Sequence, residues 1–106
     1  MIKKHVLIQE RVRRPGKGFA FVPHRFLTDG FFQSLSLHEL VLYLFLVLAS
    51  DKNGLSFYGD KTIQSILGLT GEAYTFARSC LIHKDLIAYD GTLFQILSLP
   101  SAANQS

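Results

Sequence analysis

The chain has 106 residues, a formal charge of +3 and 48% hydrophobic residues, a composition that favours one folded globular domain over a disordered tail. Its longest apolar run, residues 40–49, is about half as long as a membrane-spanning helix, and its N-terminus has too short an apolar stretch for a signal peptide. The single cysteine excludes an intrachain disulfide and fits a reducing compartment. We therefore expect a cytoplasmic protein without a membrane partner.

Positive charge is concentrated in the first residues of the chain. Residues 1–25 contain seven Lys or Arg and one acid, whereas residues 26–106 contain four Lys or Arg and seven acids. This asymmetry predicts that residues 1–20 form a basic arm that binds a polyanion, and a solvated, frayed terminus is the alternative. The candidate phosphate contacts in the arm are Arg11, Arg13, Arg14 and Lys17.

The first half of the chain predicts a strand and two helices. Residues 5–12 alternate as a short strand does, and residues 14–18, which contain Pro and two Gly, predict a loop. Apolar residues at helical spacing predict a first helix over residues 23–34. The motif of residues 36–39, a Ser followed three positions later by a Glu, is a capping box, which predicts the start of a helix that runs to about Ser50.

The helix predicted for residues 36–50 is apolar nearly all round. Such a helix belongs in the centre of the fold, and any face that the rest of the chain leaves uncovered should bind a partner. We therefore expect a homodimer. The alternative is a monomer in which the N-terminal strand and the first helix cover the same face.

Two more helices are predicted after a turn and a short strand in residues 51–57. Asp60 can cap the first of these helices, and Gly68 ends it, since glycine readily adopts the left-handed conformation at a helix C-terminus. Thr70 can cap the second helix, which extends to about Lys84. The tight glycine turn between them is typical of a helix-turn-helix.

Residues 86–89 and 92–99 predict two strands on either side of Asp90 and Gly91, a pair suited to a two-residue type I′ turn. A hairpin after a helix-turn-helix is the wing of a winged-helix domain, in which the second helix of the pair can enter the DNA major groove, about 12 Å wide. Residues 21–100 are thus predicted to form an α+β, mainly helical, winged helix-turn-helix domain. A helical pair that binds no nucleic acid is the alternative. Residues 101–106 are expected to be disordered.

The segment from Phe21 to Ile87 resembles the winged-helix domains of bacterial plasmid and phage replication initiators and of small helix-turn-helix proteins from mobile elements. The motifs that match are Phe21-Val22-Pro23, Leu35-Ser36, Glu39-Leu40, Leu42-Tyr43-Leu44, the turn of residues 51–54, Gly68-Leu69-Thr70, Leu81 and Leu86-Ile87. The resemblance implies sequence-directed binding of double-stranded DNA, often as a dimer. Two copies would read half-sites about one helical turn apart or a multiple of it.

The resemblance also assigns the side chains of the second helix. Its base-facing positions correspond to Thr70, Gly71, Glu72, Thr75 and Phe76, and its inward positions to Tyr74, Ala77 and Leu81. However, Gly71 and Phe76 replace the usual arginines, and Arg78 occupies the position of a core leucine. Ala73, Phe76, Ala77 and Cys80 form an equally good apolar stripe.

This second stripe favours a rotated helix in which Tyr74, Thr75 and Arg78 face outward and Arg78 reads guanine; weakened DNA reading is the other interpretation. The candidate DNA contacts of the helix are Thr70, Glu72, Tyr74, Thr75 and Arg78, and Lys61 is a candidate phosphate contact at the start of the preceding helix.

No catalytic, metal or cofactor site is expected. The histidines His5, His24, His38 and His83 lack metal-ligand spacing, and Cys80 lies on a packed stripe. We therefore expect a DNA-binding protein that acts in transcription regulation or in the replication or mobility of a mobile element, without a small-molecule substrate. The alternative is a winged-helix protein interaction module that does not bind DNA.

Overall fold

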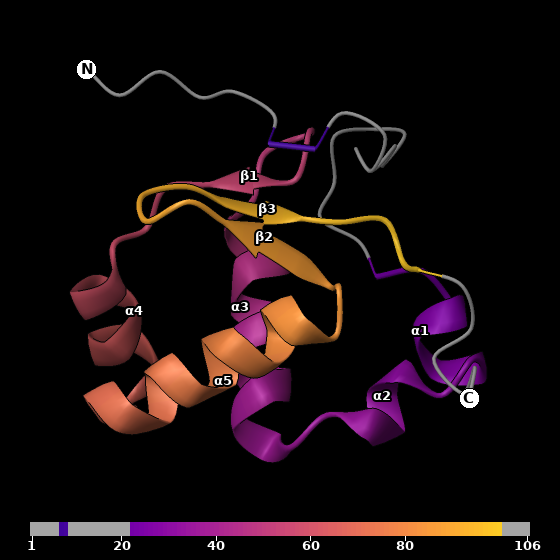
Figure 1. Ribbon diagram of the computed structural model, residues 1–106, viewed down its shortest axis with the longest axis horizontal. Helices are drawn as coiled ribbons and strands as arrows, with labels where there is room; N and C mark the ends of the chain where they lie inside the picture. Colours follow the sequence, from indigo (N-terminus) through magenta and orange to yellow (C-terminus); the bar gives the residue numbers. More distant parts are fainter. Residues whose placement is uncertain (1–6, 9–21, 101–106) are drawn as a thin grey trace.

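The computed structural model describes residues 7–8 and 22–100 (Figure 1). The fold is α+β and mainly helical, as the sequence predicted, and its three short strands form one small antiparallel sheet. In chain order the elements are α1 (Arg25–Thr28), α2 (Phe31–Ser34), α3 (Leu37–Ala49), β1 (Leu55–Ser56), α4 (Asp60–Leu67), α5 (Gly71–His83), β2 (Ile87–Tyr89) and β3 (Phe94–Ile96). In Figure 1 the sheet lies above α3 and α5, and α4 lies at the opposite end of the molecule from α1 and α2.

The single helix predicted for residues 23–34 is instead two short helices, α1 and α2. The chain breaks at Gly30, whose φ of 88° lies in the left-handed region, which glycine adopts without steric cost. Phe26 and Phe31 are nevertheless both buried. The Phe26 ring stacks on Tyr43 of α3 with centroids 5.0 Å apart, so the two short helices pack against the central helix.

Helix α3 begins with the predicted capping box. The Ser36 hydroxyl accepts a hydrogen bond from the Glu39 amide, and the Glu39 carboxylate accepts one from the Ser36 amide, each at 3.3 Å. The helix ends before Ser50, as expected. Its inner face, which includes Leu42 and Leu46, is fully buried and packs along α5 and against β3. The central position predicted for this helix is therefore confirmed.

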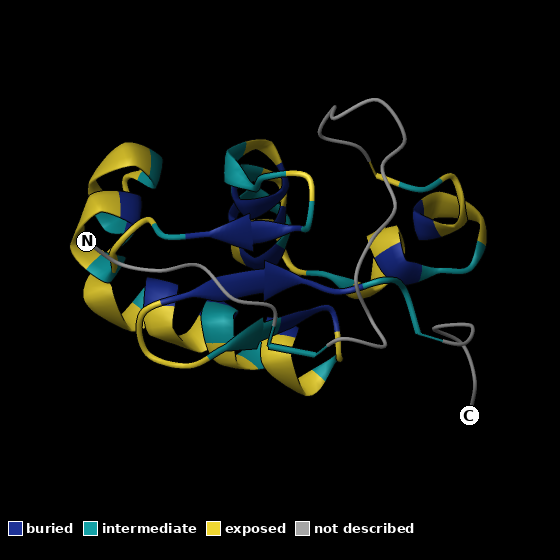
Figure 2. Cartoon of the chain, turned by 90° about the horizontal axis from the view of Figure 1, so that it is seen from above, coloured by how far each residue is buried: buried dark blue, intermediate teal, exposed yellow. Residues whose placement is uncertain are grey.

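The strands pair in the order β1-β3-β2, all antiparallel. Residue Gly54, just before β1, has a φ of 81°, and a Cβ there would lie 2.8 Å from the carbonyl oxygen of Ile96. The position therefore requires glycine. Figure 2 shows that the strands are mostly buried, whereas α4 and α5 each keep an exposed outer side.

The hairpin between β2 and β3 is present, but its turn is not the predicted type I′ turn. That turn needs a positive φ at both central residues, and in the described part of the chain Gly91 has one while Asp90 does not. The Asp90 carboxylate instead accepts hydrogen bonds from the amides of Thr92 and Leu93, at 2.9 and 2.8 Å. The side chain thus closes a longer loop.

Only Leu7 and Ile8 of the strand predicted for residues 5–12 are described, and neither forms a strand. Both of their amides donate to the Gln95 side-chain oxygen, at 2.7 and 2.8 Å, and the Gln95 amide donates to the Ile8 carbonyl at 3.0 Å. Gln95 is fully buried on β3, so it replaces a neighbouring strand as the partner of this backbone. The arm residues Arg11, Arg13, Arg14 and Lys17 and the tail of residues 101–106 lie outside the described residues.

Candidate nucleic-acid interface

The turn between α4 and α5 is built as the sequence predicted. Gly68 ends α4 with a left-handed φ of 70°, and the Leu69 amide donates to the Gln64 carbonyl at 3.0 Å. The Thr70 hydroxyl then accepts a hydrogen bond from the Ala73 amide at 3.0 Å and caps α5. The direction of the chain therefore changes within Gly68 to Thr70, and α5 leaves the turn with a fixed N-terminus.

The rotated orientation predicted for α5 is wrong. Tyr74 is 1% exposed, and Ala77 and Leu81 are fully buried, whereas Phe76 is 69% exposed. The observed orientation buries two large side chains, Tyr74 and Leu81, whereas the rotated orientation would bury one, Phe76. A large apolar side chain contributes about 1.5 to 3 kcal/mol when it is fully buried, so the observed orientation is the more stable one. Tyr74 is therefore a core residue, and the prediction that it contacts DNA is wrong.

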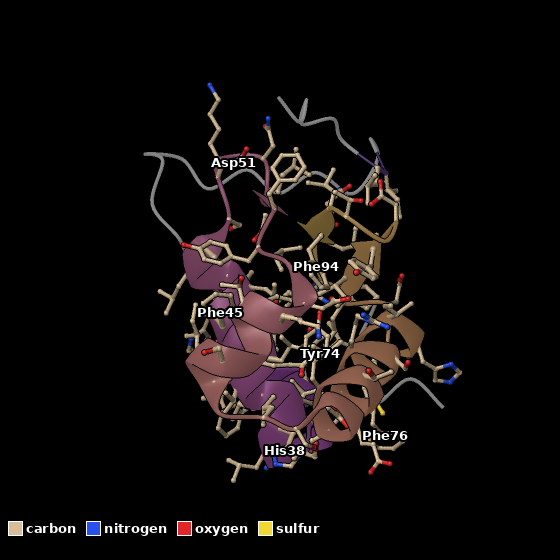
Figure 3. The ribbon with its side chains drawn as sticks, turned by 90° about the vertical axis from the view of Figure 1, so that its left-hand side faces the viewer. His38, Phe45, Asp51, Tyr74, Phe76 and Phe94 are labelled. Carbon is tan, nitrogen blue, oxygen red and sulfur yellow. The ribbon has the colours of Figure 1, made fainter. Side chains whose placement is uncertain are left out.

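The outer side of α5 is uncovered over its first turns. Its exposed side chains offer a carboxylate, hydroxyl groups and an aromatic ring, but no lysine or arginine. The exposed residues from the cap to the third turn are Thr70, Gly71, Glu72, Thr75, Phe76 and Ser79. A shallow open pocket of about 500 Å³ is lined by five of them, Gly71, Glu72, Thr75, Phe76 and Ser79. Figure 3 shows Phe76 on this outer side, away from the labelled Tyr74.

Asp60 joins α4 to α5 and β2. It was predicted to cap α4, but Gly59 holds that position and no side chain caps the helix. The Asp60 carboxylate instead accepts hydrogen bonds from the Tyr74 hydroxyl and, at 3.1 and 3.2 Å, from the Tyr89 hydroxyl. The Arg78 guanidinium also donates to it at 3.2 Å. We call Asp60, Tyr74, Arg78 and Tyr89 the Asp60 cluster.

Arg78 is part of this cluster and does not project outward as predicted. Its side chain is 20% exposed, and its guanidinium lies 4.7 Å from the ring centroid of Tyr89 and 5.3 Å from that of Tyr74. The carboxylate and the two rings satisfy the charge of Arg78 within the fold. In this arrangement the guanidinium is not available to read guanine.

The two tyrosines of the cluster remain protonated well above neutral pH. Burial, reinforced by the hydrogen bond to Asp60, raises the pKa of Tyr74. The same causes, in the same order, raise the pKa of Tyr89. Both hydroxyls therefore act as donors to the carboxylate, which holds the start of α4, the middle of α5 and the end of β2 together.

Two of the other four described Lys and Arg residues are also paired. The Lys84 ammonium lies 2.7 Å from the Glu39 carboxylate, and Arg25 lies 2.6 Å from Asp29. Lys61, by contrast, is exposed in the first turn of α4. Among the described lysines, it is the one that the sequence predicts to contact phosphate.

Cys80 lies next to the pair formed by Lys84 and Glu39. Burial raises the pKa of the Cys80 thiol, and the neighbouring Glu39 carboxylate raises it further. Burial also acts to raise the pKa of Glu39, but hydrogen bonds from Lys84, the Ser36 amide and Cys80 together lower it. Cys80 is thus a protonated thiol beside an ionised carboxylate at neutral pH.

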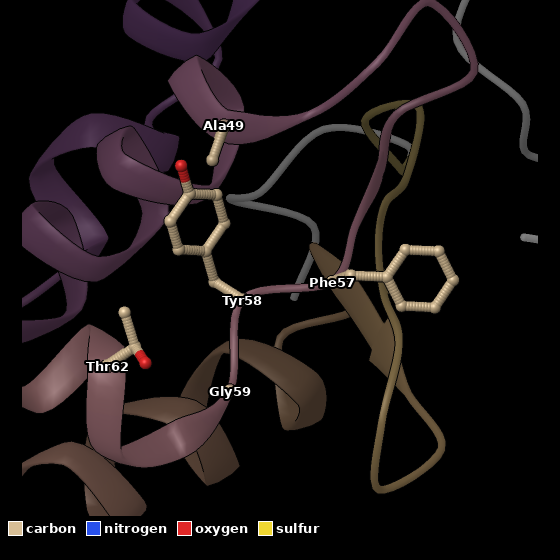
Figure 4. Close-up of a pocket in the computed structure, with 5 residues that line it drawn as sticks. All are labelled: Ala49, Phe57, Tyr58, Gly59 and Thr62. Atoms are coloured by element: carbon tan, nitrogen blue, oxygen red, sulfur yellow. The ribbon is translucent and has the colours of Figure 1, made fainter. Parts of the chain in front are cut away.

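A second pocket, of about 390 Å³, lies between the end of α3 and the start of α4 (Figure 4). It is lined by Ala49, Phe57, Tyr58, Gly59 and Thr62. None of these side chains is charged, and the Tyr58 ring packs edge-on against Phe45, with centroids 5.2 Å apart. The pocket offers apolar contact and two hydroxyl groups.

Among residues 7–8 and 22–100, no three His, Cys, Asp or Glu side chains are arranged to hold a metal ion. No helix in this described part is both long enough and apolar enough to cross a membrane. No protein-family model matches the chain, no curated protein matches its sequence and no solved structure matches its fold.

Proposed function

We propose that this chain is a winged-helix protein that binds double-stranded DNA, with α5 in the major groove. The observation that carries the proposal is the uncovered outer side of α5, which directly follows the tight turn from Gly68 to Thr70. The order of helix, strand, helix, helix and hairpin, with the sheet order β1-β3-β2, supports the winged-helix assignment. In this assignment the loop between β2 and β3 is the wing.

Base reading in this proposal uses no arginine. Glu72 and Phe76 lie one turn apart on the exposed side of α5, where both can reach base edges. A carboxylate accepts a hydrogen bond from the amino group of cytosine, and an aromatic ring contacts the methyl group of thymine. The Thr75 hydroxyl, between them, can donate or accept. We therefore expect a preference for pyrimidines on the strand that faces this helix.

Affinity in this proposal comes from the basic arm. Residues 26–106 have more acids than Lys and Arg, and Arg78 and Lys84 of α5 and its C-terminus are held in ion pairs. Lys61, the exposed lysine of α4, therefore supplies little attraction for phosphate by itself. The arm supplies the rest through Arg11, Arg13, Arg14 and Lys17. Gln95 binds the backbone of residues 7 and 8, and so anchors the arm to β3 just before the first of these arginines in the sequence.

A salt titration tests this proposal. We expect the full chain to bind a random-sequence duplex with an affinity that falls steeply as salt rises, with a slope of roughly −0.9 for each phosphate contact. Replacing Arg11, Arg13, Arg14 and Lys17 by alanine should flatten the slope and weaken binding similarly for all sequences. Lys52→Ala is the control, since this exposed lysine lies in the turn before β1, away from α5. Absence of duplex binding at low salt would refute the proposal.

One observation favours a protein interaction module instead. Phe76 and Ile82, both on α5, are 69% and 41% exposed, and the two cations of this region, Arg78 and Lys84, are held in ion pairs. A surface of this kind can bury apolar area against another protein. The same titration separates the two functions, because an interaction module has no salt-dependent affinity for DNA.

The biological role that we propose is transcription regulation or the replication or mobility of a mobile element. It follows from the resemblance to replication initiators and mobile-element proteins. Duplexes that contain the chain's own upstream region would test the regulatory version by competition against random duplex of the same length.

A further inference from the structure

Helix α3 has an uncovered apolar stripe directly opposite its buried face. The stripe, which we call the α3 stripe, consists of Leu37, Val41, Leu44 and Leu48. Its three leucines are 74%, 41% and 75% exposed, respectively. Exposed apolar residues that form a continuous line, rather than scattered singly, mark an association surface.

The residues of the α3 stripe are arranged symmetrically along the helix. Their spacing of four, three and four residues is that of a coiled-coil seam. In an antiparallel pair of α3 helices related by a two-fold axis near Leu42 and Tyr43, Leu37 would face Leu48 of the second copy, and Val41 would face Leu44 of the second copy. A two-fold interface requires this kind of self-complementarity.

Charge also favours a second copy over a different partner. The stripe contains no charged residue, and the one acid of α3, Glu39, is buried and paired with Lys84. There is thus no charge to attract an acidic or basic partner and none to repel an identical helix. We infer that two copies of the chain associate through the α3 stripe. The seam is only about 16 Å long, so we expect association in the micromolar range.

The position of the stripe determines what such a pair can do with DNA. Helix α5 packs on the buried face of α3, and Figure 3 shows α3 on the left and α5 on the right. The α3 stripe and the uncovered side of α5 each point away from this contact, so they face opposite sides of the molecule. A two-fold pair joined through the stripes therefore turns its two α5 helices away from each other. It cannot place them in neighbouring grooves on one side of a duplex, about 34 Å apart.

We therefore infer that the pair holds two separate DNA segments together, one on each copy. This inference rests on the proposed DNA binding, and it replaces the expectation that a dimer reads two neighbouring half-sites. A stiff duplex, with a persistence length of about 50 nm, cannot bend around so small a protein to reach both sides. The two segments must thus be different molecules or distant sites on one long molecule.

The first test measures association without DNA. Sedimentation equilibrium from low to high micromolar concentration should show the mass rise from 11.9 kDa towards twice that value. Leu48→Asp should remain monomeric, whereas Ile66→Asp should associate normally, because Ile66 is 54% exposed but lies on α4. Since both side chains are exposed, neither change should unfold the protein, and circular dichroism confirms this. A monomer at all concentrations, or loss of association only in Ile66→Asp, overturns the inference.

The second test measures bridging. One duplex is fixed to beads, and the retention of a second, fluorescent duplex is measured with the wild-type chain. We expect retention with wild type and Ile66→Asp, and at least tenfold less with Leu48→Asp, which still binds the fixed duplex. Wild-type dimers that bind the fixed duplex but retain no second one overturn bridging alone. If no variant binds any duplex, bridging and the proposed function both fail, and the mass measurement still decides association.

Discussion

Replacing Asp60 by alanine should weaken the fold more than its surface position suggests. Its carboxylate accepts hydrogen bonds from Tyr74, Tyr89 and Arg78, which come from two different elements. Removing it leaves the Tyr74 hydroxyl, which belongs to a buried residue, without its acceptor. A buried donor without a partner costs more than the hydrogen bond itself contributed.

The expected loss in the free energy of unfolding is the sum of three contributions. The unpaired Tyr74 hydroxyl costs about 1 to 3 kcal/mol. The pair with Arg78 contributes at most about 1 kcal/mol, because the Asp60 side chain is 41% exposed and solvent screens the interaction. The acid in the first turn of α4 adds about 0.3 to 1 kcal/mol through the helix dipole. Together these predict a loss of about 3 kcal/mol, or about 12 °C in Tm.

Thermal and urea unfolding, followed by circular dichroism, measure this loss. Glu72→Ala is the matched control, because Glu72 is also an acid in the first turn of its helix but is exposed on the outer side of α5; it should lower Tm by only a few degrees. Tyr74→Phe combined with Asp60→Ala gives the coupling between the two side chains. If Asp60→Ala melts within about 2 °C of Glu72→Ala, the Asp60 cluster does not stabilise the fold.

Four further outcomes are expected. The pKa values of Tyr74 and Tyr89 are raised from 10.0, so above pH 10 the folded state keeps protons that the unfolded state loses. The free energy of unfolding should therefore fall as the pH rises above 10, by about 1.4 kcal/mol per pH unit for each tyrosine that stays protonated only in the folded state. Urea titrations at several pH values should show a smaller fall for Tyr74→Phe than for the wild type. Ser56→Ala should stabilise the fold by about 1 kcal/mol in the same assay, since the buried Ser56 hydroxyl has no hydrogen-bond partner among the described residues. Phe76→Ala should weaken binding to a selected duplex by about 1 to 3 kcal/mol at one base pair and leave Tm unchanged. Arg78→Ala should do the reverse, with a lower Tm and an unchanged base preference in the same binding assay.

The features that could be predicted from the sequence depend on residues close together in the chain. Ser36 and Glu39 are three residues apart, and so are Thr70 and the amide that it caps, so both helix starts were predicted correctly. Gly68 ends α4 because glycine readily adopts the left-handed conformation, which depends on that residue alone. In each case the side chain and its backbone partner lie within one helical turn, and no tertiary contact is needed to establish them.

The orientation of α5 could not be predicted in this way. Two apolar stripes on this helix have similar composition, and the choice between them depends on residues elsewhere in the chain. Asp60 lies 14 residues before Tyr74 and 29 before Tyr89, too far for any local rule. One signal was nevertheless present in the sequence: Arg78 falls on an inward position in the pattern that the resemblance implies, and a buried arginine requires a carboxylate partner.

If α5 reads bases as we propose, the Asp60 cluster explains why it would do so without an arginine. Arg78 is the one arginine of α5, and the carboxylate of Asp60 holds its side chain between α5, α4 and β2. The contact that joins α5 to these elements therefore also makes Arg78 unavailable for contacts with bases. The remaining exposed side chains, such as Glu72, Thr75 and Phe76, discriminate among few base pairs. One copy would then bind DNA mainly through its basic arm, with modest sequence preference. If two copies join through α3, DNA binding by one copy raises the effective concentration of DNA at the other and so strengthens binding overall. In the geometry inferred above, this increase in affinity occurs only when the two copies bind two different DNA segments.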